Sequence, residues 1–127
     1  MVGTKRDAAN FVAISELSYE SALSKFAAVE REENEIRLQL VALKDRAFEQ
    51  VSPDSAFFGE AELRWQLWRE KRVSLLQSEL AMKLAQKADA KHHLAKAFRK
   101  REGATLMQKK LALIEAKKMQ TRQSYES

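Results

Sequence analysis

Residues that interrupt regular secondary structure are rare in this chain. Among its 127 residues there are three Gly, one Pro and no Cys. A sheet protein needs turn residues about every 8–12 positions, so this scarcity excludes all-β and α/β folds. Without Cys there are no disulfides, no thiolate zinc ligands and no cysteine nucleophile. The sequence also has no apolar run of about 18 residues that would predict a membrane-spanning helix.

The residues that are abundant favour long helices. The chain is 45% hydrophobic and 32% charged, and its richness in Ala, Glu, Lys, Leu and Arg is typical of coiled coils. Residues 1–58 hold seven Lys/Arg and ten Asp/Glu, whereas residues 59–127 hold sixteen and eight. These opposite net charges suit two segments that lie side by side. The short apolar run after Lys5 and Arg6 does not resemble a signal peptide, so we expect a cytoplasmic protein.

One clear break divides the chain into two helices of a single domain. The predicted helices span residues 4–50 and 60–122, and the turn spans 51–59, which holds the only Pro. Ser52 followed by Pro53 is one possible start of the second helix, because Ser is a common N-cap and Pro is common in the first turn. Gly59, followed by acidic residues, is another. The sequence leaves both starts open.

A heptad pattern runs along the first predicted helix. Thr4 and Asp7 have the spacing of a capping box. Beyond them, apolar residues recur at alternating steps of three and four, which predicts a coiled-coil seam. The expected seam consists of Val12, Ser15, Tyr19, Ala22, Phe26, Val29, Glu33, Ile36, Leu40, Leu43 and Ala47. Glu33 is its only charged member, and it either weakens the seam or specifies the register.

The second predicted helix has a looser apolar row. Its expected members are Leu63, Leu67, Val73, Leu76, Leu80, Leu84, Ala88, Leu94 (or Ala95), Phe98, Leu106 and Leu113. Successive steps of four between Leu76 and Leu84 depart from a strict heptad. Gly103 lies alone in this helix, where Gly costs about 1 kcal/mol relative to Ala, so we expect a soft point there.

A turn centred near residue 55 fixes the expected register of an antiparallel pairing. The facing pairs expected from it are Leu43 with Leu67, Phe26 with Leu84, and Val12 with Phe98. The first helix then ends opposite about residue 106, and the rest of the second helix projects beyond it. The expected fold is therefore all-α: a long antiparallel two-helix coiled-coil hairpin with a longer, projecting C-terminal helix.

The projecting segment is the main candidate for binding a partner. It presents large apolar and basic side chains: Leu106, Met107, Lys109, Lys110, Leu111, Leu113, Ile114, Lys117, Lys118 and Met119. Contiguous exposed apolar residues usually mark an interaction surface, and this spacing suits docking of a helix in a groove. A different protein is the favoured occupant, with a second copy of the chain and a lipid surface as alternatives.

The basic character of residues 83–122 has three interpretations. This segment holds twelve Lys/Arg and three acidic residues. It is either a solvated face matched to the acidic first helix, a dock for an acidic protein, or a nucleic-acid surface. Binding of nucleic acid is disfavoured because only Phe98 lies among these charges and Lys outnumbers Arg.

We find no pattern that predicts an enzyme. His92 and His93 are adjacent, so on a helix they point about 100° apart and cannot hold one metal ion. The acidic residues of 30–35 lack the Gly turn of a calcium loop. Phosphate-binding Gly loops and nucleophile motifs are also missing. We therefore expect no catalytic residue, metal, cofactor or small-molecule substrate.

Four of the ten aromatic residues lie close together at the predicted turn. Phe57 and Phe58 are expected to close the end of the hairpin, with one Trp packed across the seam. A two-helix structure cannot easily bury both Trp65 and Trp68, so we expect at least one of them in a second docking surface, because Trp is favoured at binding hot spots.

The chain resembles the FliJ/YscO family, the stalk proteins of flagellar and other type III export systems. The resemblance covers nearly the whole chain and rests on the Glu-rich run 30–35, the aromatic tip, and the Lys-rich second helix with its pairs at 109–110 and 117–118. It implies a shape similar to the rotary stalk of the ATP synthase. It also implies insertion of the paired helix ends into a hexameric export ATPase, contact of another part with the export gate, and a cytoplasmic location, peripheral at the inner face of the membrane.

Overall fold

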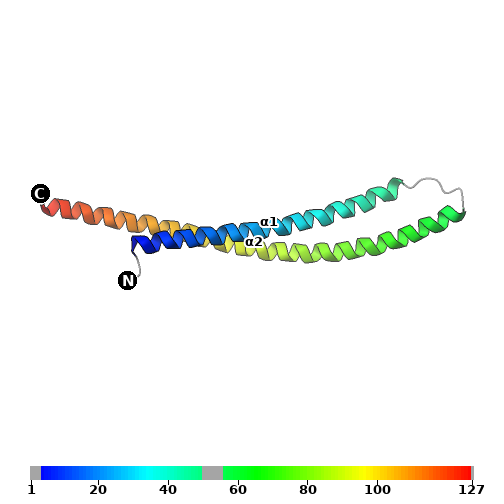
Figure 1. The fold of residues 1–127 in the computed structure, drawn as a ribbon, viewed down its shortest axis with the longest axis horizontal. Helices are drawn as coiled ribbons and strands as arrows, with labels where there is room; N and C mark the ends of the chain where they lie inside the picture. The colour runs from blue at the N-terminus through cyan, green and yellow to red at the C-terminus, as the bar shows by residue number, and fades with distance from the viewer. Residues whose placement is uncertain (1–3, 50–55, 127) are drawn as a thin grey trace. The chain divides into compact units, whose positions relative to one another are not determined.

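Two long helices account for nearly all of the described chain. The computed structural model describes residues 4–49 and 56–126, with side chains for 4–45 and 59–126. Every described residue except Thr4 is helical, in α1 (Lys5–Glu49, 45 residues) and α2 (Ala56–Glu126, 71 residues) (Figure 1). The all-α prediction is confirmed. Residues 56–59, assigned to the turn from sequence, belong to α2, and residues 50–55 lie outside the described part, as do the side chains of Phe57 and Phe58.

The start of α1 is set by a cap. The backbone N–H of Asp7 donates to the Thr4 hydroxyl at 3.1 Å, and the N–H of Ala8 donates to the Thr4 carbonyl at 3.0 Å. A threonine in this position satisfies N–H groups that have no partner inside the helix. Thr4 is therefore the N-cap, as its spacing from Asp7 predicts.

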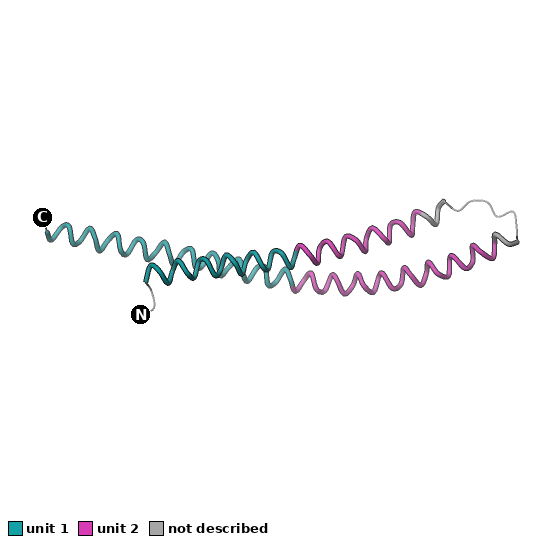
Figure 2. Tube along the Cα trace, in the orientation of Figure 1, with its two compact units in different colours: residues 1–26, 90–127 teal, residues 27–89 magenta. Residues whose placement is uncertain are grey.

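The chain divides into two compact units, each built from parts of both helices (Figure 2). Unit 1 comprises Met1–Phe26 and Ala90–Ser127, and unit 2 comprises Ala27–Asp89. Unit 1 carries thirteen Lys/Arg and six Asp/Glu, whereas unit 2 carries ten and twelve. The basic excess of the chain therefore belongs entirely to unit 1.

Three contacts between α1 and α2 define the pairing in unit 1. Lys5 Nζ lies 2.8 Å from Glu115 Oε2, and Arg101 Nε lies 3.8 Å from Glu16 Oε1. The rings of Tyr19 and Phe98 are 6.1 Å apart, centroid to centroid. Phe98 therefore faces Tyr19 rather than the expected Val12. The observed register differs there from the expected one by seven residues, or one heptad.

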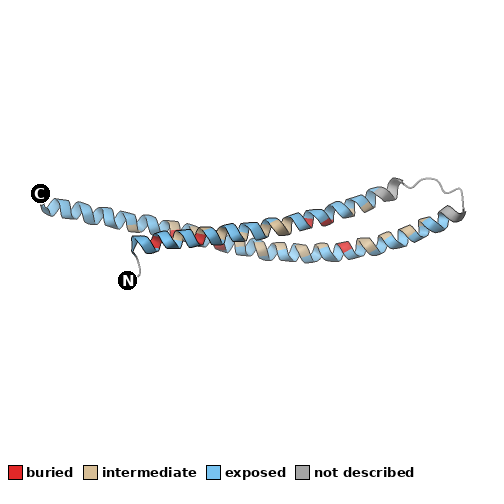
Figure 3. Ribbon diagram, in the orientation of Figure 1, coloured by how far each residue is buried: buried red, intermediate tan, exposed pale blue. Residues whose placement is uncertain are grey.

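Unit 2 is held by a thin core and by polar contacts between the helices. Leu76 of α2 is only 1% exposed, and Ile36 of α1 is also buried. Lys83 and Lys87 of α2 form ion pairs with Glu32 and Glu33 of α1. With so few buried residues (Figure 3), the stability of this unit depends on a narrow line of side chains between the helices.

The seam of α1 is the one expected from the heptad pattern. Ser15, Glu33 and Ile36 are buried, and the other expected members are half-buried, apart from Ala47, whose side chain lies outside the described residues. Ala8, one further step toward the N-terminus, extends the same pattern and is also buried. The alternating steps of three and four keep all these side chains on one face of α1.

The seam of α2 differs from the expected apolar row. Val73, Leu76, Leu80 and Leu94 are buried or half-buried against α1. The other expected members are exposed, Phe98 among them although its ring lies beside that of Tyr19: Leu63, Leu67, Leu84, Ala88, Phe98, Leu106 and Leu113. Their places are taken by the buried or half-buried side chains of Lys83, Lys87, Ala90, Ala97, Arg101 and Ala104. Long basic side chains replace leucines there because their aliphatic stems pack on α1 while their charged ends reach its acidic residues.

Candidate partner-binding surfaces

The expected partner-binding residues near the C-terminus of α2 are mostly solvent-accessible. The large apolar residues among them are between 48% and 64% exposed: Leu106, Met107, Leu113, Ile114 and Met119. The four lysines at 109, 110, 117 and 118 are also exposed, whereas Leu111 is half-buried. We call these ten residues the C-terminal surface. It combines apolar area and positive charge on a helix.

Most of the C-terminal surface does not project beyond α1, which corrects the expected overhang. The Lys5–Glu115 ion pair shows that the first turn of α1 lies beside residue 115 of α2, not beside residue 106. Only residues 116–126, all of them exposed, extend past this contact. The overhang is shorter than expected because the register in unit 1 pairs Tyr19, rather than Val12, with Phe98.

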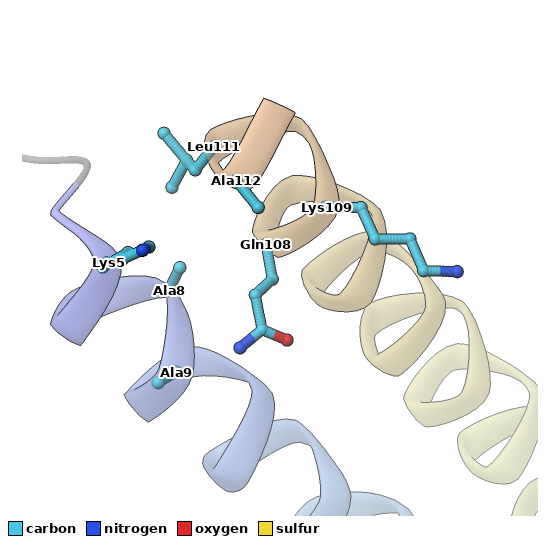
Figure 4. Close-up of a pocket in the computed structure, with 7 residues that line it drawn as sticks. All are labelled: Lys5, Ala8, Ala9, Gln108, Lys109, Leu111 and Ala112. Atoms are coloured by element: carbon cyan, nitrogen blue, oxygen red, sulfur yellow. The ribbon is translucent and has the colours of Figure 1, made fainter. Parts of the chain in front are cut away.

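Small residues open a groove between the start of α1 and the C-terminal surface (Figure 4). Its volume is about 450 Å³, and its lining is formed by Lys5, Ala8, Ala9, Gln108, Lys109, Leu111 and Ala112. Leu111 therefore lies at the edge of the seam instead of on a free helix. Because three of the lining residues are alanines, the two helices leave space that larger side chains would fill.

An aromatic and basic cluster in unit 1 was missed by sequence reasoning. The Arg101 guanidinium lies 4.0 Å from the Tyr19 ring centroid and 5.3 Å from that of Phe98, a cation–π arrangement. Phe98 also lines a shallow groove of about 390 Å³ with Tyr19, Lys91, Leu94, Ala95 and Arg99. Arg101 lies one heptad after Leu94, and this spacing could have placed it on the buried face. A heptad pattern built from apolar residues alone leaves an arginine out.

The buried charge of Glu33 is neutralised from both helices. Lys87 Nζ of α2 donates to one carboxylate oxygen and Arg37 Nε of α1 to the other, each at 2.9 Å. These hydrogen bonds, that from Lys87 first, lower the pKa of the Glu33 carboxyl below its ordinary value and outweigh the effect of burial. Lys87, read from sequence as part of a basic segment open to several uses, therefore serves the contact between the helices.

The two tryptophans of unit 2 have different surroundings. Trp65 is half-buried, with the Arg69 guanidinium 5.8 Å from its ring centroid. Trp68 is 53% exposed. Trp68 is therefore accessible to a partner, and its place in a second docking surface stays a prediction. We call Trp65 and Trp68 the tryptophan surface.

Two kinds of feature are absent from the described part of the chain. Residues 4–49 and 56–126 contain no cluster of three or more His, Cys, Asp or Glu side chains that could hold a metal ion. No helix among the described residues has the length and hydropathy to cross a membrane. No protein-family model, curated protein or solved structure matches this chain.

Proposed function

We propose that this protein is a non-enzymatic stalk or adaptor of a flagellar or type III protein export apparatus, similar to the FliJ/YscO proteins. In this role its helices form an antiparallel coiled-coil hairpin. The C-terminal surface binds the hexameric export ATPase, and the tryptophan surface contacts the export gate. ATP hydrolysis at the ring is thereby coupled to protein export.

The observation that carries the proposal is the composition of the C-terminal surface. Five large apolar side chains are about half exposed or more, and four exposed lysines accompany them. Glu115, the only acidic residue between Glu102 and Glu126, is already paired with Lys5. The surface therefore retains an uncompensated positive charge, which suits an acidic protein surface with an apolar groove.

Charge reversal in residues 116–126 tests this proposal. We expect Lys117→Glu combined with Lys118→Glu to weaken binding to a purified export ATPase about tenfold or more and to abolish any stimulation of its ATP hydrolysis. The matched control is Lys91→Glu combined with Lys96→Glu, which makes the same charge change at exposed residues of unit 1 outside the C-terminal surface. Equal binding by both variants would reject the C-terminal surface as the ATPase contact.

Truncation complements the charge variants if the chain ends beyond the residues of α2 that contact α1. A chain ending after Gly103 would lose Ala104, Leu111 and Glu115, all of which face α1. A chain ending after Glu115 keeps these contacts and removes only the exposed end. We expect the second truncation to retain the helical content of the remaining residues and to lose most of the ATPase binding.

The alternative function is a structural coiled-coil protein that assembles with itself through the C-terminal surface. Two copies of unit 1 would bring together two sets of thirteen Lys/Arg and six Asp/Glu, and like charges oppose such an association. Sedimentation of the unmodified chain beside the Lys117→Glu, Lys118→Glu variant at several concentrations distinguishes the two functions. Self-association that Lys117→Glu and Lys118→Glu strengthen, by reducing repulsion, would favour the alternative.

A further inference from the structure

A second apolar face lies on α2 in unit 2, to one side of the buried seam. Trp68, Leu75 and Met82 are 53%, 51% and 63% exposed and follow one another at intervals of seven residues. Seven residues are close to two helical turns, so these side chains form one row, spaced about 10 Å apart. We call them the outer row. A heptad-spaced row of large apolar side chains is the pattern by which a helix pairs with another helix.

The outer row is complementary to itself. If two copies of α2 lie antiparallel with a two-fold axis at Leu75, each Leu75 meets the same residue of the second copy. The same symmetry places Trp68 opposite Met82 of the second copy, and Met82 opposite Trp68. Contacts between a thioether and an aromatic ring are favourable, and a contact of this kind, in which one patch meets itself, is the usual interface of a two-fold dimer.

The charges beside the outer row are also complementary under this symmetry. Arg72 and Glu79 lie one heptad apart on the same side of the row, so the two-fold axis brings each Arg72 opposite Glu79 of the other copy. Among the described residues, Glu79 takes part in no ion pair. Arg72 donates one hydrogen bond, Nη2 to Gln39 Oε1 at 3.4 Å, which leaves other guanidinium N–H groups for a second acceptor.

We propose that unit 2 pairs with unit 2 of a second copy through the outer row, in a two-fold antiparallel dimer. Unit 2 carries ten Lys/Arg and twelve Asp/Glu, so self-association meets little net repulsion, in contrast to unit 1. The row contributes only three large apolar side chains per copy, and an interface of this size supports a dissociation constant on the order of micromolar. This inference rests on other observations than those that carry the proposed function, and because both surfaces include Trp68, the dimer and the gate contact exclude each other.

Cross-linking tests the position of the two-fold axis. The chain has no Cys, so Leu75→Cys introduces a single thiol, which the proposal places against the same thiol of the second copy. A disulfide requires Cβ atoms about 3.5–4.5 Å apart. We expect mild oxidation to convert this variant into a covalent dimer that a reductant reverses. The controls are Val41→Cys and Leu113→Cys, at residues that are 53% and 63% exposed, and they should remain largely monomeric.

Sedimentation equilibrium tests the energetics. We expect the unmodified chain to dimerise at micromolar concentrations and Leu75→Glu to weaken the dimer at least tenfold, since it places two carboxylates on the axis. Glu79→Arg should also weaken it, and the double variant Arg72→Glu with Glu79→Arg should restore it. Circular dichroism establishes that each variant remains helical.

Three results would overturn the inference. The first is a chain that remains monomeric at hundreds of micromolar. The second is oxidative cross-linking that is as efficient at position 41 or 113 as at position 75. The third is a dimer that survives Leu75→Glu but is lost with Leu113→Glu, because this would move the contact to the C-terminal surface.

Discussion

At the scale of single residues, Glu33 shows how the helices recognise each other. It is the one charged member of the α1 seam, and the sequence left open whether it weakens the seam or specifies register. Its carboxylate is bound by Lys87 of α2 as well as by Arg37 of its own helix. Any shift of α2 along α1 would leave this carboxylate without Lys87 in a poorly hydrated place, which is costly. The pairing therefore supports a role in register.

The lowered pKa of Glu33 predicts a pH-dependent contribution to stability. Because the folded chain holds this carboxyl below its ordinary pKa of about 4.5, the contribution is fully present above that pH and is lost as pH falls through the lower, folded value. We expect Glu33→Gln to reduce the thermal midpoint at pH 7. The difference from the unmodified chain should shrink below about pH 4.5 in thermal melts followed by circular dichroism.

Subtracting the thermal midpoint of Glu33→Gln from that of the unmodified chain at each pH cancels the effect of the other acidic residues, because both proteins contain them. Lys87→Gln provides the complementary measurement, since it removes the first cause of the lowered pKa. A stability difference between the unmodified chain and Glu33→Gln that stays constant from pH 7 to pH 3 would contradict the assignment of this contribution to Glu33.

Leu76 is the residue whose truncation should be most costly in unit 2. At 1% exposed it is the most completely buried large side chain described. Leu76→Ala should lower the free energy of unfolding by about 2 kcal/mol or more, the lower part of the range for buried Leu. Leu38→Ala is the control, because Leu38 is 69% exposed. Urea unfolding should separate the two variants, and similar midpoints would show that the narrow core does not dominate stability.

At the scale of elements, the two helices differ in how far sequence predicts them. The buried face of α1 follows a simple heptad rule, because nearly every seam residue is apolar or small. The buried face of α2 does not, because Lys83, Lys87 and Arg101 occupy positions that the rule reserves for apolar residues. Counting apolar residues selected Leu84 and Phe98, one position away from Lys83 and Ala97. These basic residues lie on the buried face because acidic residues of α1 pair with them. The periodicity of α2 alone contains no information about residues of α1.

Gly103 offers a test within α2. The helix continues through this residue, and a Cβ added there would meet nothing within 4 Å. Gly103→Ala should therefore stabilise the chain by about 0.5–1 kcal/mol, since Ala has the higher helix propensity and loses less conformational entropy on folding. Gly59→Ala, where the added Cβ also has open space, should stabilise less if the start of α2 is already frayed. If Gly103→Ala destabilised the chain instead, Gly103 would have to adopt a conformation other than that of an ordinary, uncrowded α-helix.

At the scale of the whole molecule, the register determines how much of α2 lacks a partner. The sequence correctly indicated that α2 is longer than α1 and that its C-terminal part is apolar and basic. The turn position alone predicts that the overhang begins at residue 106. The Tyr19–Phe98 contact moves that point by one heptad, to about residue 113, and the Lys5–Glu115 ion pair is the last contact with α1 along α2 among the described residues. No local pattern could supply this distance.

Hydrogen exchange should reveal this boundary along α2. Residues 116–126 are all exposed, whereas Leu76, Ala97 and Ala104 are buried against α1. Backbone amides in the unsupported end should exchange orders of magnitude faster than those of residues 76–104, because an isolated helical end opens without breaking tertiary contacts. Mass spectrometry at a concentration well below the micromolar range measures the free chain. Strong protection of residues 116–126 there would mean that another part of the protein covers them.

The unequal charge of the two seams has a consequence for synthesis of the chain. α1 is made first, and its buried face carries Glu33, which would meet the same carboxylate if two nascent α1 helices paired in parallel and in register. Lys83, Lys87 and Arg101 would likewise oppose one another between two copies of α2. Like charges at buried positions disfavour such pairs. Parallel, in-register pairing of two nascent α1 helices is thus disfavoured relative to pairing of each α1 with the α2 of its own chain.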